Sequence, residues 1–283
     1  MRSTLSRVDT LALPIICLIV SENSHPLVSE NSHPFRAIAS SHAHEAGAVI
    51  SGHRHEYHQL VYVSTGVIAV RTGQGSWVAS SARAIWIPAN TWHEHRVYGL
   101  SSVHTLGFPA DGAPLPVDSP TVVAVDTLLR ELLIAGSDPA LPASEARRIH
   151  AVLNDRLRRA HAQPLTLPAP HDPRLAQACQ VVTDDLSRPR TVTWLARRVG
   201  VGERTLARLF RAEFGMTYPQ WRTNTRVFHA MVLLAEGATV TEAAQRCGWV
   251  TTSAFIDTFA RTMGRTPGEY RAEARGHGRR PAG

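Results

Sequence analysis

The feature that constrains this chain most is an internal repeat in its C-terminal part. The segment VTWLARRVGVGERTLARLFRAEFGMTYPQW (192–221) aligns with VTEAAQRCGWVTTSAFIDTFARTMGRTPGEY (240–270) at an offset of 48 residues, and of 49 after one extra residue in the second copy. The matching pairs are Val192/Val240, Ala196/Ala244, Gly200/Gly248, Leu206/Phe255, Phe210/Phe259, Gly215/Gly264, Thr217/Thr266 and Trp221/Tyr270. Two copies with the same apolar and glycine positions predict two copies of one local fold.

Each copy is predicted to form a short helix, a turn with glycine and a longer helix, which is the helix-turn-helix arrangement. Ala196 and Ala244 are small where two helices must cross closely. Gly200 and Gly248 stand where the first helix ends, and glycine there allows the positive φ that ends many helices. The residue types therefore agree with the motif at the points where its geometry is most demanding.

The two copies are joined by PQWRTNTRVFHAMVLLAEG, which predicts one continuous amphipathic helix. Thr251 is a good N-cap for the second helix of the second copy, and Gly202 is the weaker cap in the first copy. A rigid joining helix would fix the separation of the two motifs, at roughly 34 Å if they enter successive major grooves. The helices that we predict are 174–186, 193–199, 203–214, 219–235, 241–247, 252–263 and 267–275.

The positive charge of the chain is confined to the same part. Residues 171–283 contain 17 Arg and 10 acidic residues, whereas residues 1–170 contain 13 of each, and the chain has no Lys. A basic domain indicates a polyanionic partner, with nucleic acid as the first candidate. Charge alone is equally compatible with a merely soluble basic surface.

Residues 174–273 resemble the DNA-binding domain of the AraC/XylS family of bacterial transcription regulators. The stretch AFIDTFARTMGRTPGEYR is similar to the most recognisable part of that family, with a Phe in the second helix followed by G-x-T-P-x-x-Y-R. The resemblance implies a cytoplasmic regulator that binds promoter DNA and responds to a small-molecule effector. It implies neither catalytic activity nor binding to a membrane. An activator of this kind would also contact RNA polymerase.

The outward sides of the two second helices supply the candidate DNA-reading residues. Arginine grips guanine in a bidentate way and also neutralises phosphate, so we assign Arg204 and Arg208 to bases and Arg211 to the backbone. Asp257 either accepts from a cytosine amine or pairs with Arg261, and we favour the pair. The first motif is therefore expected to contribute more specificity. The DNA-binding residues that we predict are Arg204, Ala207, Arg208, Arg211, Thr252, Ser253 and Asp257.

The N-terminal half has a pattern of short strands from about residue 47 to residue 108. QLVYVSTGVIAVRTG alternates around a turn, and no long helical period interrupts the segments that follow. This pattern predicts a compact antiparallel barrel or sandwich. The fold class is therefore α+β, with an N-terminal cupin-like β-barrel followed by an all-α double helix-turn-helix domain.

A group of polar residues in that half resembles the two motifs of the cupin barrel. His53-x-His55-x-x-x-Gln59 corresponds to the first motif, and IWIPANTWH, which ends at His93, corresponds to the second. In metal-binding cupins these side chains converge inside the barrel, but Gln59 occupies the place of their carboxylate. The effector-binding residues that we predict are His53, His55, Gln59, Trp86 and His93.

Several functions of these histidines remain open. We favour an effector pocket without a cofactor. A divalent metal on His53, His55 and His93 is the alternative, although neutral Gln59 is a poor ligand. The histidines would otherwise be strand residues without a ligand role. The competing function for the whole chain is a cupin metalloenzyme, an oxygenase or isomerase, with an accessory basic domain.

The remaining segments complete the predicted organisation. Two helical patterns within 119–162 either cover the barrel or form a homodimer interface, and the first is predicted to begin with the apolar residues at 122 and 125. The domains that we predict are a poorly ordered N-terminal segment 1–40, the effector-sensing barrel 41–110, the helical region 119–162, a Pro-rich linker 163–173, the double helix-turn-helix domain 174–273 and a basic flexible tail 274–283.

Overall fold

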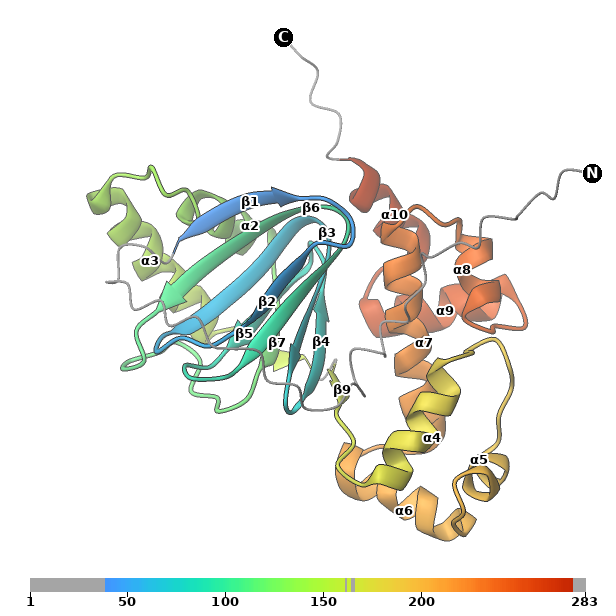
Figure 1. Cartoon of the computed structure of the whole chain (residues 1–283). Coiled ribbons are helices and arrows are strands. Elements are labelled where there is room, and N and C mark those ends of the chain that lie inside the picture. The colour runs from blue at the N-terminus through green and yellow to red at the C-terminus, as the bar shows by residue number, and fades with distance from the viewer. Residues whose placement is uncertain (1–38, 161, 164–165, 277–283) are drawn as a thin grey trace, which may run out of the picture.

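The computed structural model describes residues 39–276, apart from residues 161, 164 and 165. A curled antiparallel sheet has two helices against one side and a larger helical domain against the other (Figure 1). No helix in this part of the chain is long and apolar enough to cross a membrane. The prediction for residues 1–38 lies outside the described residues.

The sheet contains nine described strands, which pair in the order β1-β6-β3-β5-β7-β8, with β2 on β6 and with β4 between β3 and β9. The antiparallel sheet domain is confirmed, but the expected barrel is not closed, because among the described residues the pairing does not return from β8 to β1. The α2–α3 helices intervene between β7 and β8 in the chain, and β8 adds only two residues to that edge. The strands are β1 (Ser40–His44), β2 (Val49–His53), β3 (His58–Thr72), β4 (Gly75–Ala79), β5 (Arg83–Ile87), β6 (His93–Phe108), β7 (Thr121–Ala124), β8 (Ala162–Gln163) and β9 (Thr166–Pro168).

The long strands β3 and β6 bend together and so serve both halves of the sheet. Their pairing shifts register around Val63 and Val67, next to Gly66, whose φ is 76°. A Cβ on Gly66 would lie 1.8 Å from Oγ of Ser101 on β6, so the close approach of β3 to β6 at this bend requires glycine. The bend encloses an apolar interior lined by Val61, Val63, Ile68, Val70, Trp77, Ala79, Ile85, Ile87, Val97, Val103 and Val122.

Helices α2 (Thr127–Gly136) and α3 (Ala143–Arg158) cover the outer face of one half of the sheet. The sequence analysis places the start of the first helix too early. Thr121–Ala124 forms strand β7, which pairs with β5. This β-branched run favours a strand, and Asp126 then caps α2 by accepting from the Leu129 amide. Covering the sheet is thus an observed role of these helices, and a homodimer interface stays a prediction.

The C-terminal part is helical, as predicted, with two helix-turn-helix units on either side of α7. The last helix runs to Gly276, three residues into the predicted tail, and residues 277–283 lie outside the described part. The helices are α4 (Pro173–Thr183), α5 (Val192–Arg198), α6 (Glu203–Phe214), α7 (Tyr218–Ala235), α8 (Val240–Arg246), α9 (Thr252–Met263) and α10 (Pro267–Gly276).

The structural details of the repeat follow its sequence. Gly200 and Gly248 have φ of 71° and 75°, so both turns use the left-handed region that glycine favours. Thr251 accepts from the Ala254 amide and caps α9, whereas Gly202 caps α6 without a side-chain hydrogen bond. Both expectations about the caps are confirmed.

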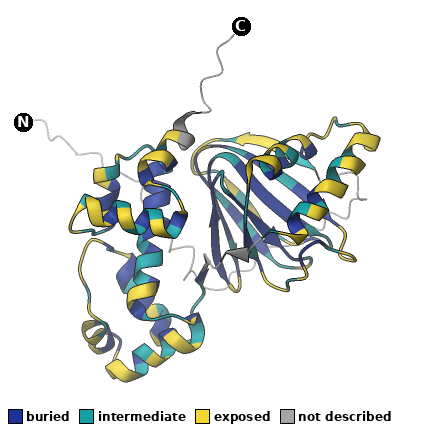
Figure 2. Cartoon of the chain, turned by 180° about the vertical axis from the view of Figure 1, so that it is seen from behind, coloured by how far each residue is buried: buried dark blue, intermediate teal, exposed yellow. Residues whose placement is uncertain are grey.

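The two units differ in what they pack against. The first unit has an apolar core of its own, formed by α4–α7. The second shares one core with the outer face of the sheet, to which Val67, Ala69, Val78 and Tyr98 contribute. In Figure 2 the strands are mostly buried, whereas exposed residues gather on the outward faces of the helices. The sheet and the second unit therefore form one packed body.

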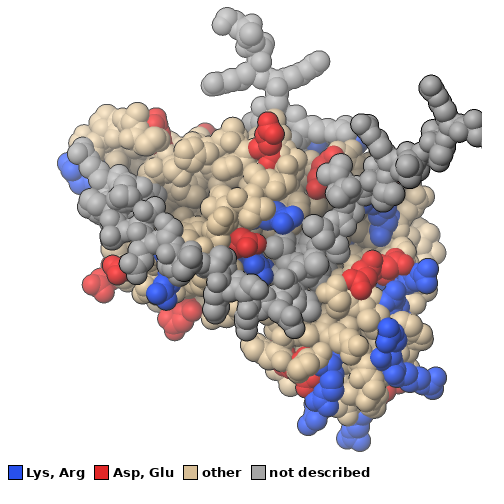
Figure 3. All heavy atoms as spheres, in the orientation of Figure 1, with Lys and Arg blue, Asp and Glu red and all other residues tan. Residues whose placement is uncertain are grey.

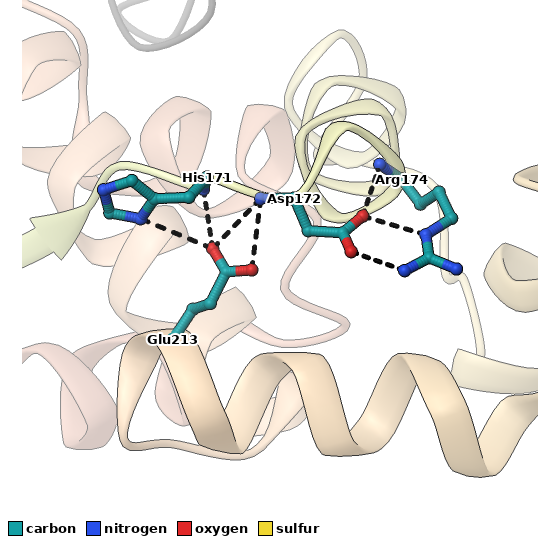
Figure 4. Close-up of polar contacts among 4 residues, drawn as sticks. All are labelled: His171, Asp172, Arg174 and Glu213. Atoms are coloured by element: carbon teal, nitrogen blue, oxygen red, sulfur yellow. Dashed lines mark hydrogen bonds and ion pairs between the residues drawn. The ribbon is translucent and has the colours of Figure 1, made fainter.

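The segment between the sheet and α4, predicted as a linker, is tied down at both ends. Strand β9 pairs with β4, and the Ala169 amide donates to the Gln74 carbonyl at 3.1 Å. The amides of His171 and Asp172 then donate to the Glu213 carboxylate of α6 at 2.6 and 3.1 Å (Figure 4). A short strap therefore connects the sheet edge directly to the end of α6.

Candidate functional site

The first candidate surface is the outward side of α6. Arg204, Arg208 and Arg211 are exposed and Ala207 is partly exposed. The buried side of the same helix carries Leu206, Phe210 and Phe214, which anchor it in the core of the first unit. The four predicted residues of this helix thus share its solvent-exposed side, where they are free to meet a duplex.

The outward side of α9 is much less charged. Ser253 and Asp257 are exposed and Thr252 is partly exposed. The favoured ion pair between Asp257 and Arg261 is absent from the described contacts, although both side chains are described and exposed. An exposed pair of this kind gains little from one fixed geometry, and both roles of Asp257 stay predictions.

Further basic residues around the first unit were missed by sequence reasoning. Arg197 and Arg198 are exposed in the last turn of α5, and Arg190 lies 5.2 Å over the ring of Trp194, which is 46% exposed. Figure 3 shows positive side chains gathered over the lower part of the molecule, where α5 and α6 lie. The signal was the WLARR run of the first helix, since arginine there has no role in the core.

The second candidate site is a histidine cluster inside the bend of the sheet. His53 ends β2, His55 follows it, and His93 begins β6 opposite His53. One ring nitrogen from each of the three lies within 4.8 Å of the others. The structure therefore brings together the three histidines that the sequence singled out.

His95 is a fourth member that the sequence analysis did not name. It stands two residues after His93 on β6, so both side chains project to the same face of the strand. Its ring centroid lies 5.1 Å from that of His93 and 5.8 Å from that of His53. The alternation HEH in the sequence was the signal. We call His53, His55, His93 and His95 the histidine cluster.

Burial keeps much of this cluster uncharged. Burial lowers the pKa of His93 to about 3, and it lowers the pKa of His55 as well. Burial and the neighbouring histidines hold the pKa of His95 well below its usual range. These rings are therefore neutral at physiological pH, the form in which imidazole accepts a hydrogen bond or a metal ion.

The other two predicted effector residues lie in different places. Gln59 is buried beside His55, near enough to oppose the lowering of the His55 pKa, yet its Oε1 makes no hydrogen bond of good geometry in the described part of the chain. Trp86 does not join the cluster, because alternation along β5 directs Ile85 and Ile87 inward and Trp86 toward α2 and α3. Trp86 instead packs against Phe108 under the covering helices, and its role in effector binding stays a prediction.

A buried arginine connects the sheet to the second unit. Arg83 on β5 is 5% exposed and donates to the Thr262 carbonyl at 3.2 Å and to Sδ of Met263 at 2.9 Å. Burial and the neighbouring Arg265 lower the pKa of Arg83 to about 10, so the side chain is still positive at neutral pH. A positive group at the C-terminal end of a helix is stabilised by the helix dipole.

Comparison with known proteins identifies both halves. Residues 195–273 match a family described as a helix-turn-helix domain, and residues 37–111 match one described as an AraC-like ligand binding domain. The HTH-type transcriptional regulator NimR of Escherichia coli (strain K12) is 27% identical over 215 residues, which cover 75% of this chain and 78% of NimR. The Arabinose operon regulatory protein of the same organism is 27% identical over 187 residues, which cover 65% of this chain and 61% of that protein.

Among solved structures, the DNA-binding domain of AdpA in complex with a target DNA is 34% identical, with a TM-score of 0.36, and the match covers 40% of this chain and all of that one. The double helix-turn-helix fold and the ligand-binding sheet define a two-domain, DNA-binding transcription regulator. This chain belongs to the AraC/XylS family of such regulators, with an N-terminal sensor domain.

Proposed function

We propose that α6 and α9 read promoter DNA and that a small molecule inside the N-terminal sheet changes how they do so. The observation that carries this proposal is that the sheet contacts the supports of both reading helices. A ligand that alters the packing of the sheet therefore acts on the spacing or orientation of both.

The connection to α9 is a buried contact. Arg83 holds the last turn of this helix, and the core beneath it is shared with Val67 and Ala69 of β3. At Gly99 the backbone of β6 approaches α7 so closely that a Cβ would lie 2.6 Å from the Ala235 carbonyl oxygen. Close-packed contacts of this kind transmit small shifts instead of absorbing them.

The connection to α6 runs through the strap. Strand β9 pairs with β4. The amides of His171 and Asp172, which come after β9 in the chain, donate to Glu213 near the C-terminal end of α6. The side chain of Asp172 accepts from the Arg174 amide, and its hydrogen bonds with Arg174 hold the pKa of Asp172 well below its usual range. A displacement of β4 would reach α6 through only a few residues.

The mechanism we propose is a two-state equilibrium between packings of the sheet against the helical domain. A ligand shifts such an equilibrium only as far as it prefers one packing. The interior beside the histidine cluster is the candidate effector site, because its wall is apolar and its few polar atoms converge there.

We also propose a cytoplasmic homodimer, in which the outward face of α3, with Val152 43% exposed, contributes to the interface. RNA polymerase would be a partner if the protein activates transcription.

The competing function is a cupin-type metalloenzyme with an accessory basic domain. Its test requires the whole chain, because a fragment without α7–α10 would expose the apolar face that the sheet shares with them. Oxygen consumption or isomerase turnover by protein loaded with iron or manganese would support the enzyme, and we expect neither.

The experiment that tests the proposed function combines ligand screening with DNA binding. Small molecules that raise the Tm of the full chain are added to the protein on a duplex selected from a random pool, and Kd is measured by fluorescence anisotropy. We expect a stabilising ligand to change this Kd, and the change to be lost in Val63→Phe, which fills the interior. Ligands that raise Tm through the interior without any effect on Kd would contradict the proposal.

A further inference from the structure

Three members of the histidine cluster share one hydrogen-bond arrangement. Nδ1 of His53, His55 and His93 contacts the carbonyl oxygen of Ser51, Tyr57 and Thr91 at 2.8, 2.7 and 2.8 Å respectively. A carbonyl only accepts, so each Nδ1 carries the proton and donates it. Each Nε2 is then left with a free lone pair, and the orientation of each ring is fixed.

Two of the freed nitrogens make no hydrogen bond of good geometry within the described part of the chain. Nε2 of His55 and of His93 is buried without a hydrogen-bond partner, and His53, which is partly exposed, closes the group from the solvent side. Three lone pairs that face one another in an apolar interior are unfavourable unless a shared electrophile lies between them. In metal-binding histidines the ring nitrogen that does not bind the metal usually donates a hydrogen bond to a nearby oxygen, and Nδ1 does so in all three of these residues.

His58 in the same stretch of sequence shows that this arrangement is not a general property of the segment. Its Nε2 donates to the Ala110 carbonyl at 3.2 Å, and its Nδ1 accepts from the Ala89 amide at 3.1 Å. Both nitrogens are therefore used by the protein. In the same segment, Nε2 of His55, which meets His93 at the interior, has no hydrogen-bond partner among the described residues.

The donor set fits a transition metal and not a hard cation. Imidazole nitrogen suits Zn²⁺, Cu²⁺, Fe²⁺ and Ni²⁺, whereas Mg²⁺ and Ca²⁺ require oxygen ligands. Three histidines hold zinc with an open fourth position. Gln59 stands where a carboxylate would neutralise the ion. The charge of the metal would therefore remain positive and would favour an anionic group in the open fourth position.

Two further polar side chains lie beside the three histidines. Both ring nitrogens of His95 and Oε1 of Gln59 are buried without partners among the described residues. Neither residue is needed as a ligand once three imidazoles are in place. Their unpaired atoms are explained if they bind a group that the metal holds.

We propose that His53, His55 and His93 bind one divalent transition metal through Nε2, and that His95 and Gln59 hydrogen bond an anionic effector group in its open coordination position. This inference rests on the proposed function for the role of the effector, and it specifies the chemical class of that effector. His95 and Gln59 are positioning residues for the effector and not metal ligands.

The metal site is tested with Co²⁺, whose visible absorption reports its ligands directly. Full-length protein is stripped with a chelator, checked for its native fold by circular dichroism, and titrated with Co²⁺. We expect one ion per chain and the intense bands of four-coordinate Co²⁺. His93→Gln and His55→Gln are expected to weaken binding at least about 100-fold, since loss of a metal ligand costs more than the 10- to 100-fold effect of its outer partners.

The matched control is His58→Gln, which changes a histidine of the same segment with no free nitrogen and is expected to keep the wild-type Co²⁺ affinity. Equal loss in His58→Gln and His93→Gln, in folded protein, would overturn the proposal. So would the absence of saturable Co²⁺ binding by the wild type.

The open position is tested with azide as the anionic probe on the Co²⁺-loaded protein. We expect azide to shift the absorption bands, and His95→Leu to weaken azide binding about tenfold, as the loss of one hydrogen bond to a charged group does, without changing Co²⁺ affinity. Azide binding unaffected by His95→Leu would contradict the role of His95. Sequence-specific DNA binding by the stripped protein is measured beside these titrations, so that a missing metal site is distinguished from a failure of the proposed regulator.

Discussion

The guanidinium of Arg83 on β5 donates to the main-chain carbonyl of Thr262 at 3.2 Å, in the last turn of α9. The final carbonyls of a helix have no partner within the helix, so an arginine from the sheet satisfies one of them. The second reading helix is thus held by the domain that is expected to sense the effector. This contact, together with the shared apolar core, links the sheet to the second helix-turn-helix unit.

Arg83→Leu is expected to lower the free energy of unfolding by about 1–3 kcal/mol, because it leaves a partly buried carbonyl without its charged donor. Urea denaturation followed by tryptophan fluorescence measures this change. Arg148→Leu is the control, since Arg148 is exposed on α3, and it should stay within about 0.5 kcal/mol of the wild type. Equal stabilities for the two variants would show that the Arg83 contact does not hold α9.

Gly99→Ala is expected to separate the sheet from α7. Gly99 has φ of 69°, and its added Cβ would meet the Ala235 carbonyl oxygen at 2.6 Å. Gly47→Ala is the matched control, because Gly47 has φ of 85° but nothing within 4 Å. Backbone strain costs both variants roughly 1–2 kcal/mol, and only Gly99→Ala should also speed hydrogen exchange in α7. Similar exchange in both variants would contradict a rigid contact here.

Arg208→Ala is expected to weaken binding to the preferred duplex by about 1–3 kcal/mol and to relax one base position. Arg208 is exposed on the outward side of α6 and has no ion pair in the described part of the chain. Arg147→Ala on α3 removes the same charge far from this surface and serves as the control. Selection from random duplexes measures both variants, and a base preference that survives Arg208→Ala unchanged refutes the assignment.

The stability of the protein is expected to fall on acidification, in part through His104. This ring lies between Ser64 and Ser137, and burial, with Arg130 nearby, lowers its pKa from 6.5 to about 4. Below pH 6.5 the unfolded chain binds a proton at this site that the folded chain takes up only near pH 4. The free energy of unfolding therefore decreases over that window, by up to ~1.4 kcal/mol per pH unit for this group. His104→Gln should make the slope shallower, and an unchanged slope would contradict the buried neutral ring.

The helical domain was accessible from the sequence because its repeat states each constraint twice. Glycine at both turns and apolar residues at helical spacing in both copies left few alternatives, and helices 203–214 and 252–263 were predicted to the residue. The outward-facing arginines of α6 followed from the same periodicity. Their contacts with bases stay predictions, since they depend on a duplex.

The sheet was harder to predict because strand pairing is non-local. The alternation at 59–72 predicted strands, but it did not predict that α2 and α3 would cover the face of β5 that carries Trp86. His95 was overlooked although it shares a face with His93. The contacts of Arg83 and Glu213 join residues far apart in the chain, and no local pattern indicates them.

We propose that α6 and α9 occupy successive major grooves on one side of the DNA. Hydroxyl-radical footprinting of the full chain on a duplex selected from a random pool measures this directly. We expect two protected patches about one helical turn apart, with the patch under α6 lost in Arg204→Ala/Arg208→Ala. A single patch, or no sequence preference even at low salt, would contradict it.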